Sequence, residues 1–176
     1  ICEMLNKLPA VVWTNPDFKW LDPANGIGNF PLVVYYKLMD SLKEIIPNKK
    51  ERSTHIIENM LYMVELNPVN SLVCREIFHM INPDAEPNIH TGSFLEDGWK
   101  SEFGVDMFDV IIGNPPWNKP KSGVQTGSRA KNTLWDYFII QALDSLKPNG
   151  YLSFINPAGW RGLSPNYRDL WNTMKN

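Results

Sequence analysis

Short runs of hydrophobic residues alternate along the chain with stretches in which hydrophobic residues recur every three or four positions. A short hydrophobic run is typical of a buried strand, whereas the wider spacing is typical of an amphipathic helix. Regular alternation of the two predicts an α/β domain with a mainly parallel sheet. The predicted strands lie around Lys19–Leu21, Leu61–Leu66, Asn88–Thr91, Phe108–Ile112 and Tyr151–Ile155.

Two helices with long apolar faces are predicted between the first three strands. One begins at Pro31 and ends before Pro47, and its apolar face is formed by Leu32, Tyr35, Tyr36, Met39, Leu42 and Ile46. The other begins near Pro68, and its apolar face is formed by Val69, Leu72, Val73, Ile77, Met80 and Ile81. Both sets follow helical spacing, so each helix is expected to present one hydrophobic side.

The remaining connections are shorter or more polar. A charged linker at residues 49–52 leads through a short helix to the second strand. Residues 118–131 carry three lysines and one arginine without periodicity, which predicts a mobile basic loop. A helix over Thr133–Leu146 follows, with Asn132 as its cap, and a last helix starts at Ser164-Pro165.

The composition fits one globular domain over residues 1–176, because 43% of the residues are hydrophobic and no internal repeat is present. The net charge of −2 excludes a basic face over the whole domain, so any contact with nucleic acid must rely on a local basic region or a further part. No apolar run is long enough to span a membrane and no signal peptide is recognisable, so we expect a cytoplasmic location and no membrane partner. Because the chain begins at Ile1 and stops in an apparently helical stretch, we expect a fragment.

Cysteine and histidine residues are few and widely spaced. Cys2 and Cys74 lie far apart, and the three histidines form no ligand pattern with them. We therefore expect no metal site and no disulfide.

A turn with two glycines follows the first predicted strand. Gly26 and Gly28 allow a ligand to approach the backbone, and the helix that begins beyond Phe30 offers free N–H groups. The third glycine of a dinucleotide site is absent, and the carboxylate of Asp22 would repel a pyrophosphate. The turn therefore predicts a nucleoside or cationic cofactor, although an ordinary strand-to-helix turn is the alternative.

An acidic residue ends the second predicted strand. Glu65 occupies the position from which a carboxylate accepts hydrogen bonds from ribose hydroxyls in doubly wound folds. A solvated loop glutamate would be the default interpretation of this residue alone. Its place after the glycine turn favours the ribose-binding role.

The most specific segment follows the central predicted strand and reads Asn114-Pro115-Pro116-Trp117. Pro115 holds Asn114 in an extended backbone, so the amide oxygen and the Pro115 carbonyl can converge on one donor. Two acceptors on a ring-attached amino group favour a pyramidal nitrogen whose lone pair attacks a methylsulfonium carbon. Trp117 can stack on a planar substrate, in particular an extruded base.

With these motifs, nearly the whole chain resembles the adenine-specific DNA methyltransferases of restriction-modification systems. The resemblance implies a Rossmann-like fold that transfers a methyl group from S-adenosylmethionine to the exocyclic amino group of a flipped adenine in DNA. It implies a cofactor site that includes Asp22, Gly26, Gly28, Phe30 and the ribose-binding Glu65. It also implies a catalytic motif formed by Asn114, Pro115, Pro116 and Trp117.

The chain departs from the family pattern in three places. Near the cofactor's adenine the family commonly has an acid between Gly and Phe, whereas here Ser93 precedes Phe94, and its hydroxyl is the expected partner of that adenine. The stretch around Asn48–Ser53 is longer than the compact pattern and is expected to be a surface insertion. The family fold adds a reversed strand pair after the fifth strand, which this chain cannot form, so we expect an incomplete fold with an open sheet edge.

Two other functions fit parts of the pattern. Glutamine methyltransferases of translation release factors also carry Asn-Pro-Pro followed by an aromatic residue, and a noncatalytic module could bind S-adenosylmethionine. Trp117 and the basic loop favour DNA, and the intact Asn114 favours catalysis. The resemblance implies that target recognition, and any endonuclease, lies in attached or associated parts.

Overall fold

The computed structural model describes residues 1–118, 133–158, 170 and 172. They form a five-stranded sheet in the order β3-β2-β1-β4-β5, and every neighbouring pair of strands is parallel. This confirms the predicted α/β fold class. The strands are β1 (Trp20–Asp22), β2 (Leu61–Glu65), β3 (Asn88–Thr91), β4 (Phe108–Gly113) and β5 (Leu146–Phe154).

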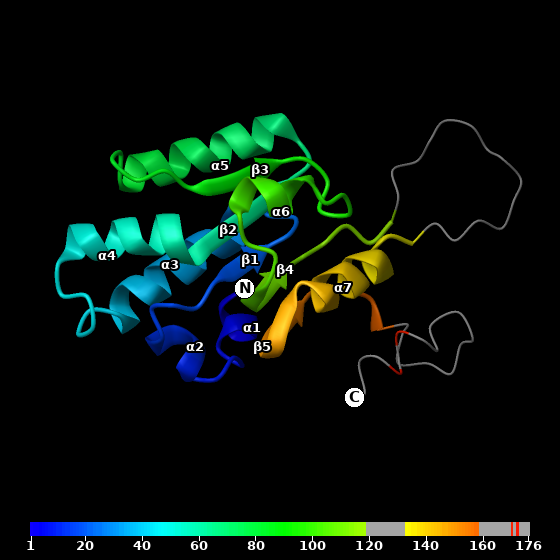
Figure 1. Cartoon of the computed structure of the whole chain (residues 1–176), viewed down its shortest axis with the longest axis horizontal. Coiled ribbons are helices and arrows are strands. Elements are labelled where there is room, and N and C mark those ends of the chain that lie inside the picture. The colour runs from blue at the N-terminus through cyan, green and yellow to red at the C-terminus, as the bar shows by residue number, and fades with distance from the viewer. Residues whose placement is uncertain (119–132, 159–169, 171, 173–176) are drawn as a thin grey trace, which may run out of the picture.

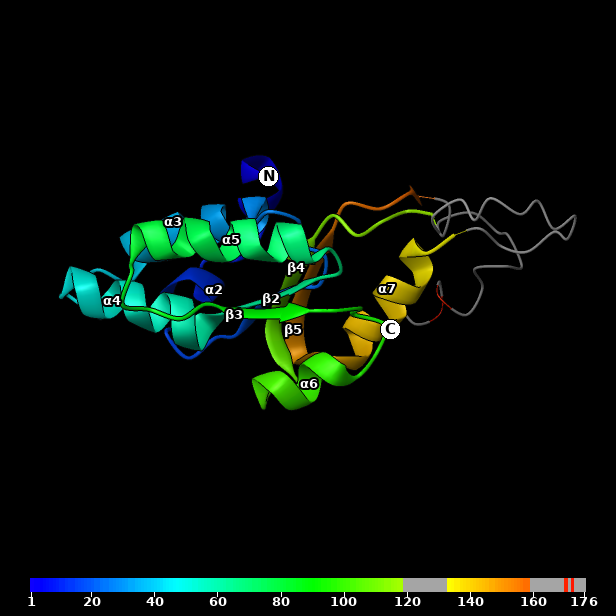
Figure 2. The ribbon, with the colours of Figure 1, turned by 90° about the horizontal axis from the view of Figure 1, so that it is seen from above.

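Helices cover both faces of the sheet, with α3 and α5 on one face and α6 and α7 on the other (Figures 1 and 2). Two short N-terminal helices precede β1, and a π-helix joins α4 to β2. The helices are α1 (Cys2–Leu5), α2 (Val11–Thr14), α3 (Asn29–Ser41), α4 (Lys49–His55), the π-helix Ile56–Met60, α5 (Pro68–Ile81), α6 (Gly98–Phe103) and α7 (Trp135–Asp144). Within the described residues no helix is long and apolar enough to cross a membrane.

The central strands are buried on both sides because successive side chains point to opposite faces of the sheet. Along β1, Trp20 joins the core beneath α3 and α5, whereas Leu21 joins the core beneath α6 and α7. In β4 the same alternation assigns Val110 to the first core and Ile111 to the second. These continuous hydrophobic runs are the reason that the strands were predictable from the sequence.

The segment predicted as a charged linker is instead the helix α4, with Asn48 as its N-cap. The Asn48 side chain accepts hydrogen bonds from the backbone N–H groups of Lys50 and Glu51. Arg52 is buried and donates to the carbonyls of Ile46 and Pro47. Residues 48–51 of the expected surface insertion are exposed, whereas Arg52 and Ser53 anchor it in the fold.

The predicted apolar face of α5 is largely exposed, which corrects the interpretation of its pattern, whereas on the predicted face of α3 only Tyr36 is exposed. Tyr36 on α3 is 61% exposed, and Met80 on α5 is 85% exposed. The side of α5 that packs on the sheet carries Ser71, Cys74 and Phe78. Ser71 and Cys74 are small because this part of α5 lies close to the turn after β1, where a Cβ on Gly28 would lie 2.7 Å from the Cys74 sulfur.

Other boundaries shifted by a few residues. The predicted helix over Thr133–Leu146 is α7, and Leu146 already belongs to β5, whose pairing with β4 is irregular between Phe108 and Val110. The helices α1, α2 and α6 were not predicted. Residues 119–131 of the predicted basic loop, the cap Asn132 and the helix expected at Ser164-Pro165 lie outside the described residues.

Candidate functional site

The carboxyl ends of β2, β1 and β4 lie side by side and carry the polar residues singled out in the sequence. In the sheet order, β2 ends at Glu65, β1 ends at Asp22 and β4 ends at Gly113, directly before Asn114. The strand order reverses between β1 and β4, and open α/β sheets bind ligands at the crevice outside this point. The topology therefore gathers segments that are far apart in the sequence at one edge.

A cleft of about 420 Å³ opens at this edge. Its volume is within the range of small-molecule sites. Six of the predicted site residues line it, namely Gly26, Glu65, Ser93, Phe94, Asn114 and Pro116. Asp22, Gly28, Phe30, Pro115 and Trp117 do not line it.

Glu65 is the most constrained polar residue of the cleft. It is 9% exposed, and its Oε2 accepts the backbone N–H of Gly26 at 2.8 Å. Its Oε1 accepts the backbone N–H of Asn67 at 2.9 Å and an amide hydrogen of Asn70 at 3.2 Å. The carboxylate therefore holds the glycine turn against the end of β2, and its remaining lone pairs can accept hydroxyl donors from the cleft.

Asp22 is buried at the tip of β1 behind the cleft. Its Oδ1 accepts the backbone N–H of Ala24 at 3.1 Å, whereas its Oδ2 is buried and has no hydrogen-bond partner among the described residues. Burial, reinforced by the nearby charge of Glu65, raises the pKa of Asp22 to about 7, although the Ala24 hydrogen bond acts in the opposite direction. An unsatisfied buried oxygen of this kind fits a cationic donor.

Gly28 sets the spacing between the glycine turn and the sheet-covering helices. Its φ is +95°, and a Cβ at this position would lie 2.7 Å from the Cys74 sulfur on α5. Gly26 also has a positive φ of +57°, but a Cβ there would meet nothing within 4 Å. Gly28 is thus required for packing, and Gly26 leaves open space beside the cleft. Phe30, in the first turn of α3, is buried in the core next to this turn.

The Asn114–Trp117 segment leaves the sheet in an ordered conformation. The Gly113 carbonyl accepts the backbone N–H of Ile155, and the Trp117 indole N–H donates to the carbonyl of the same residue at 3.3 Å. Pro115 is buried, whereas the Asn114 side chain is exposed and makes no hydrogen bond with the described residues. The amide is therefore available to a ligand, and the 48% exposed Trp117 ring is available for stacking.

The opposite wall of the cleft is hydrophobic and includes residues that the sequence analysis missed. Leu134 and Phe138, at the start of α7, line the cleft. Phe94 lies 5.6 Å from the Phe138 ring and 5.3 Å from the Trp99 ring, where it stacks. The spacing of Leu134 and Phe138 was visible as one helical turn, but a pair at this spacing is equally typical of a core helix.

Ser93 lies between the polar and the hydrophobic walls. It follows β3, and its hydroxyl oxygen accepts the backbone N–H of Leu95 at 3.2 Å. Because an oxygen that accepts this bond keeps its own hydrogen, the hydroxyl can still donate into the cleft.

Two other findings limit the alternatives. Among residues 1–118 and 133–158, no group of three His, Cys, Asp or Glu side chains could hold a metal ion. A larger cavity of about 750 Å³ lies between α3 and α5, but none of the predicted site residues lines it.

Comparison with known proteins gives one family and several similar structures. The family model described as Eco57I restriction-modification methylase matches residues 36–176. A relative from Mycoplasma pneumoniae, described as an uncharacterized adenine-specific methylase, is 28% identical over 85% of this chain. The chain spans about half the length of that relative, at 50% coverage.

Among solved structures, the M protein of the type I restriction enzyme EcoKI has a TM-score of 0.66 at 16% identity and covers 88% of this chain and 33% of its own. The type ISP restriction-modification enzyme LlaBIII, solved bound to DNA, has a TM-score of 0.62 at 19% identity. That match covers 89% of this chain and 13% of LlaBIII. At such low identity these structures establish the similarity of the fold.

Proposed function

The chain belongs to the Eco57I restriction-modification methylase family, and from this premise we propose that it transfers a methyl group from S-adenosylmethionine to the exocyclic amino group of adenine in DNA. The observation that supports this most is the single cleft that combines Gly26, Glu65 and Asn114. In this cleft the turn at Gly26 has open space beside it, the Glu65 carboxylate can accept two hydroxyl groups, and the Asn114 amide has no hydrogen-bond partner among the described residues.

The residues of the cleft, together with Asp22 behind it, fit S-adenosylmethionine by their donors and acceptors. Glu65 accepts the ribose hydroxyls with the lone pairs that Gly26, Asn67 and Asn70 leave free. The unpartnered Oδ2 of Asp22 suits an ammonium group. The bound cofactor would supply an electrophilic methyl group on a sulfonium centre.

The hydrophobic wall suits a flat heteroaromatic ring. Phe94 and Phe138 offer apolar faces on one side of the cleft, and Ser93 can donate its hydroxyl hydrogen to a ring nitrogen at the rim. Aromatic walls also exclude water from this end of the cleft.

Asn114 acts on the acceptor amine. Its amide oxygen and the Pro115 carbonyl accept the two amino hydrogens, which turns the nitrogen lone pair toward the methyl donor. Because Pro115 and Pro116 restrict the backbone, these acceptors need little reorganisation as the reaction proceeds. Trp117 stacks on the extruded base and holds it against Asn114.

A methylation assay on the intact protein tests the proposal. Radiolabelled S-adenosylmethionine is offered with duplex DNA, single-stranded DNA and a glutamine-containing peptide as separate acceptors. We expect label in adenine of DNA and none in the peptide. Label in the peptide alone would instead favour the protein-glutamine class, and binding without transfer to any acceptor would favour a noncatalytic module.

Asn114→Ala provides the decisive variant, and Asn156→Ala is its matched control. Asn156 also precedes a proline at the end of a strand, but its amide donates to the neighbouring Pro157 carbonyl and does not line the cleft. We expect the Asn114 variant to lose roughly 10²- to 10³-fold in the rate of transfer with little change in cofactor affinity. Near-normal transfer by this variant would refute the assigned role.

Target recognition is assigned to parts beyond this cleft. The net charge of −2 gives little general attraction to phosphate, which normally dominates affinity for DNA. We therefore propose that attached or associated regions, including any endonuclease, select the DNA sequence. A protein reduced to residues 1–176 should bind cofactor and fail to methylate one defined duplex sequence, and efficient site-specific methylation would contradict this.

A further inference from the structure

The outer surface of α5, together with Tyr36 of α3, exposes several large hydrophobic side chains. Val69, Val73 and Met80 lie on one side of α5 at positions i, i+4 and i+11, and they are 64%, 38% and 85% exposed. Tyr36 on α3 is 61% exposed. Contiguous patches of this kind usually mark an interaction surface.

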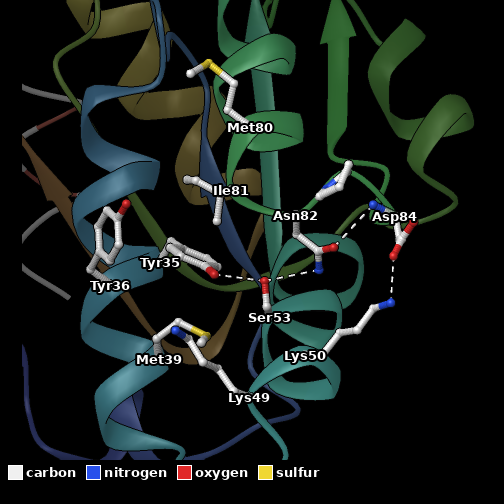
Figure 3. A pocket seen from close by; sticks show the side chains of 11 residues that line it. Tyr35, Tyr36, Met39, Lys49, Lys50, Ser53, Met80, Ile81, Asn82 and Asp84 are labelled. Atoms are coloured by element: carbon white, nitrogen blue, oxygen red, sulfur yellow. Dashed lines mark hydrogen bonds and ion pairs between the residues drawn. The ribbon is translucent and has the colours of Figure 1, made fainter.

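A groove continues this surface between the two helices. It has a volume of about 750 Å³, and its walls include Tyr36 and Met39 from α3 and Met80 and Ile81 from α5 (Figure 3). We call it the α3–α5 groove. Two methionines in the walls suit a partner side chain of irregular shape, because their flexible thioethers adapt to what they contact.

The floor of the α3–α5 groove is preorganised. The Tyr35 and Ser53 hydroxyls lie 2.8 Å apart, and Ser53 also accepts an amide hydrogen from Asn82 at 3.2 Å. Tyr35 and Ser53 are 3% and 6% exposed, so the floor is held by buried hydrogen bonds. The groove is therefore a formed feature between packed elements.

Positive charge marks one end of the groove. Lys49 and Lys50 of α4 line that end, and Lys50 pairs with Asp84 at 2.7 Å (Figure 3). Within the described part of the chain Lys49 has no ion-pair partner, so its ammonium group remains for a carboxylate of the occupant.

We propose that the α3–α5 groove docks an amphipathic helix that presents large apolar side chains to Met39 and Met80 and a carboxylate to Lys49. A helix satisfies its own backbone hydrogen bonds, whereas an extended segment would leave N–H groups facing these apolar walls. We assign this helix to a partner protein, because the apolar walls of the groove and the Lys49 ammonium group are both left unmatched by the described residues.

This docking surface is independent of the proposed methyl transfer, because none of the residues that line the cleft lines the α3–α5 groove. Failure of either proposal would leave the other standing. The groove also lies toward the amino ends of the strands, since Ile81 and Asp84 lead from α5 into the start of β3.

Photocrosslinking in the intact purified protein, with its copurifying subunits, tests the proposal. Met80→p-benzoylphenylalanine places the reactive group at the groove without disturbing the core, because this side chain is 85% exposed. Ile140→p-benzoylphenylalanine on α7 is the matched control, with 49% exposure on the opposite face of the sheet. Mass spectrometry then identifies the crosslinked peptide.

We expect the Met80 position to crosslink to a peptide with hydrophobic residues at helical spacing and a nearby Asp or Glu, and the Ile140 position not to do so. Lys49→Glu should lower that yield by about three- to tenfold, whereas Lys43→Glu, which lies outside the groove, should not change it. A crosslink to α5 of a second copy, a crosslink to an extended segment without carboxylates, or no crosslink above the control would each overturn the proposal.

Discussion

The cleft at the carboxyl edge of the sheet and the α3–α5 groove both have hydrophobic walls, but the side chains in these walls differ in how exposed they are. In the cleft, Phe94 and Phe138 are 1% and 6% exposed and pack on one another. In the groove, Tyr36 and Met80 are 61% and 85% exposed. The aromatic side chains of the cleft are packed against other residues of this fold, whereas Tyr36 and Met80 of the groove are left exposed by it.

The polar groups of the two regions differ in the same way. Glu65 and Asp22 in and behind the cleft keep unused acceptor capacity although they are buried. The buried hydroxyls of Tyr35 and Ser53 beneath the groove bond to each other, and Asn82 bonds to Ser53. Unused polar capacity therefore points to a small polar ligand in the cleft, and unused apolar surface points to a protein partner at the groove.

The largest expected difference is in stability. Phe94→Ala should lower the free energy of unfolding by about 3 to 5 kcal/mol, because it removes a ring stacked on Trp99 and leaves a cavity. Met80→Ala should change it by less than about 0.5 kcal/mol, because little of that side chain is buried by this fold. Urea denaturation measures both.

A large loss of stability in the Met80 variant of the intact protein would contradict the expectation that this side chain is exposed there. It would mean that the side chain is buried there by a docked segment, and photocrosslinking at the same position should then succeed. A small loss in the Phe94 variant would contradict the assignment of the cleft wall to the core.

The pH dependence of Asp22 gives the next effect. Since folding raises the Asp22 pKa from 3.8 to about 7, the folded protein holds a proton that the unfolded chain has released between these pH values. Stability of the unliganded protein should therefore fall as pH rises toward 7, by up to roughly 4 kcal/mol, and level off above it. Asp22→Asn should remove this fall and be the more stable protein at pH 8.

Cofactor affinity should respond with the opposite sign. If the ionised Asp22 accepts an ammonium group of S-adenosylmethionine, binding requires loss of the proton. Affinity measured by calorimetry should then weaken by about tenfold per pH unit below pH 7 and should be independent of pH in Asp22→Asn. A wild-type affinity that does not change between pH 5.5 and 8 would refute the role of Asp22 as the acceptor of the ammonium group.

The glycine turn should show a smaller, local effect. Gly28→Ala should destabilise the protein by about 2 to 3 kcal/mol, since it combines a left-handed backbone with a contact at 2.7 Å to the Cys74 sulfur. Gly26→Ala, which has a positive φ but open space, should cost only about 1 kcal/mol.

A double-mutant cycle identifies the contact. Gly28→Ala combined with Cys74→Ala should recover part of the loss, because the sulfur atom is gone and the backbone strain remains. Strict additivity of the two single losses would show that the sulfur contact is not the cause.

Strands and their ends could be predicted from the sequence because their determinants are local. The run Asn88–Thr91 was found at its predicted bounds, and Glu65 and Asn114 follow buried runs whose carboxyl ends must meet at one edge of a parallel sheet. The topology then placed Asn114 and Glu65 in the same cleft without further information.

The packed face of α5 could not be predicted in this way, because it depends on packing that is not local. The apolar pattern of α5 is real, but α5 turns Ser71 and Cys74 toward the sheet, where the glycine turn leaves room only for small side chains. Likewise, Leu134 and Phe138 became recognisable as cleft residues only once the structure showed that they line the same cleft as Glu65.

The smallest expected effect compares one serine from each region. Ser93→Ala should weaken S-adenosylmethionine binding by about two- to tenfold and leave the free energy of unfolding nearly unchanged, because the Ser93 hydroxyl lines the cleft and its hydrogen bond from Leu95 is only partly buried. Ser53→Ala should do the reverse. It breaks a buried network with Tyr35 and Asn82, so stability should fall by about 1 to 3 kcal/mol while cofactor affinity stays the same. Calorimetry and urea denaturation on both variants measure this crossover, and a Ser93 variant that loses stability but not affinity would show that its hydroxyl only supports the turn after β3.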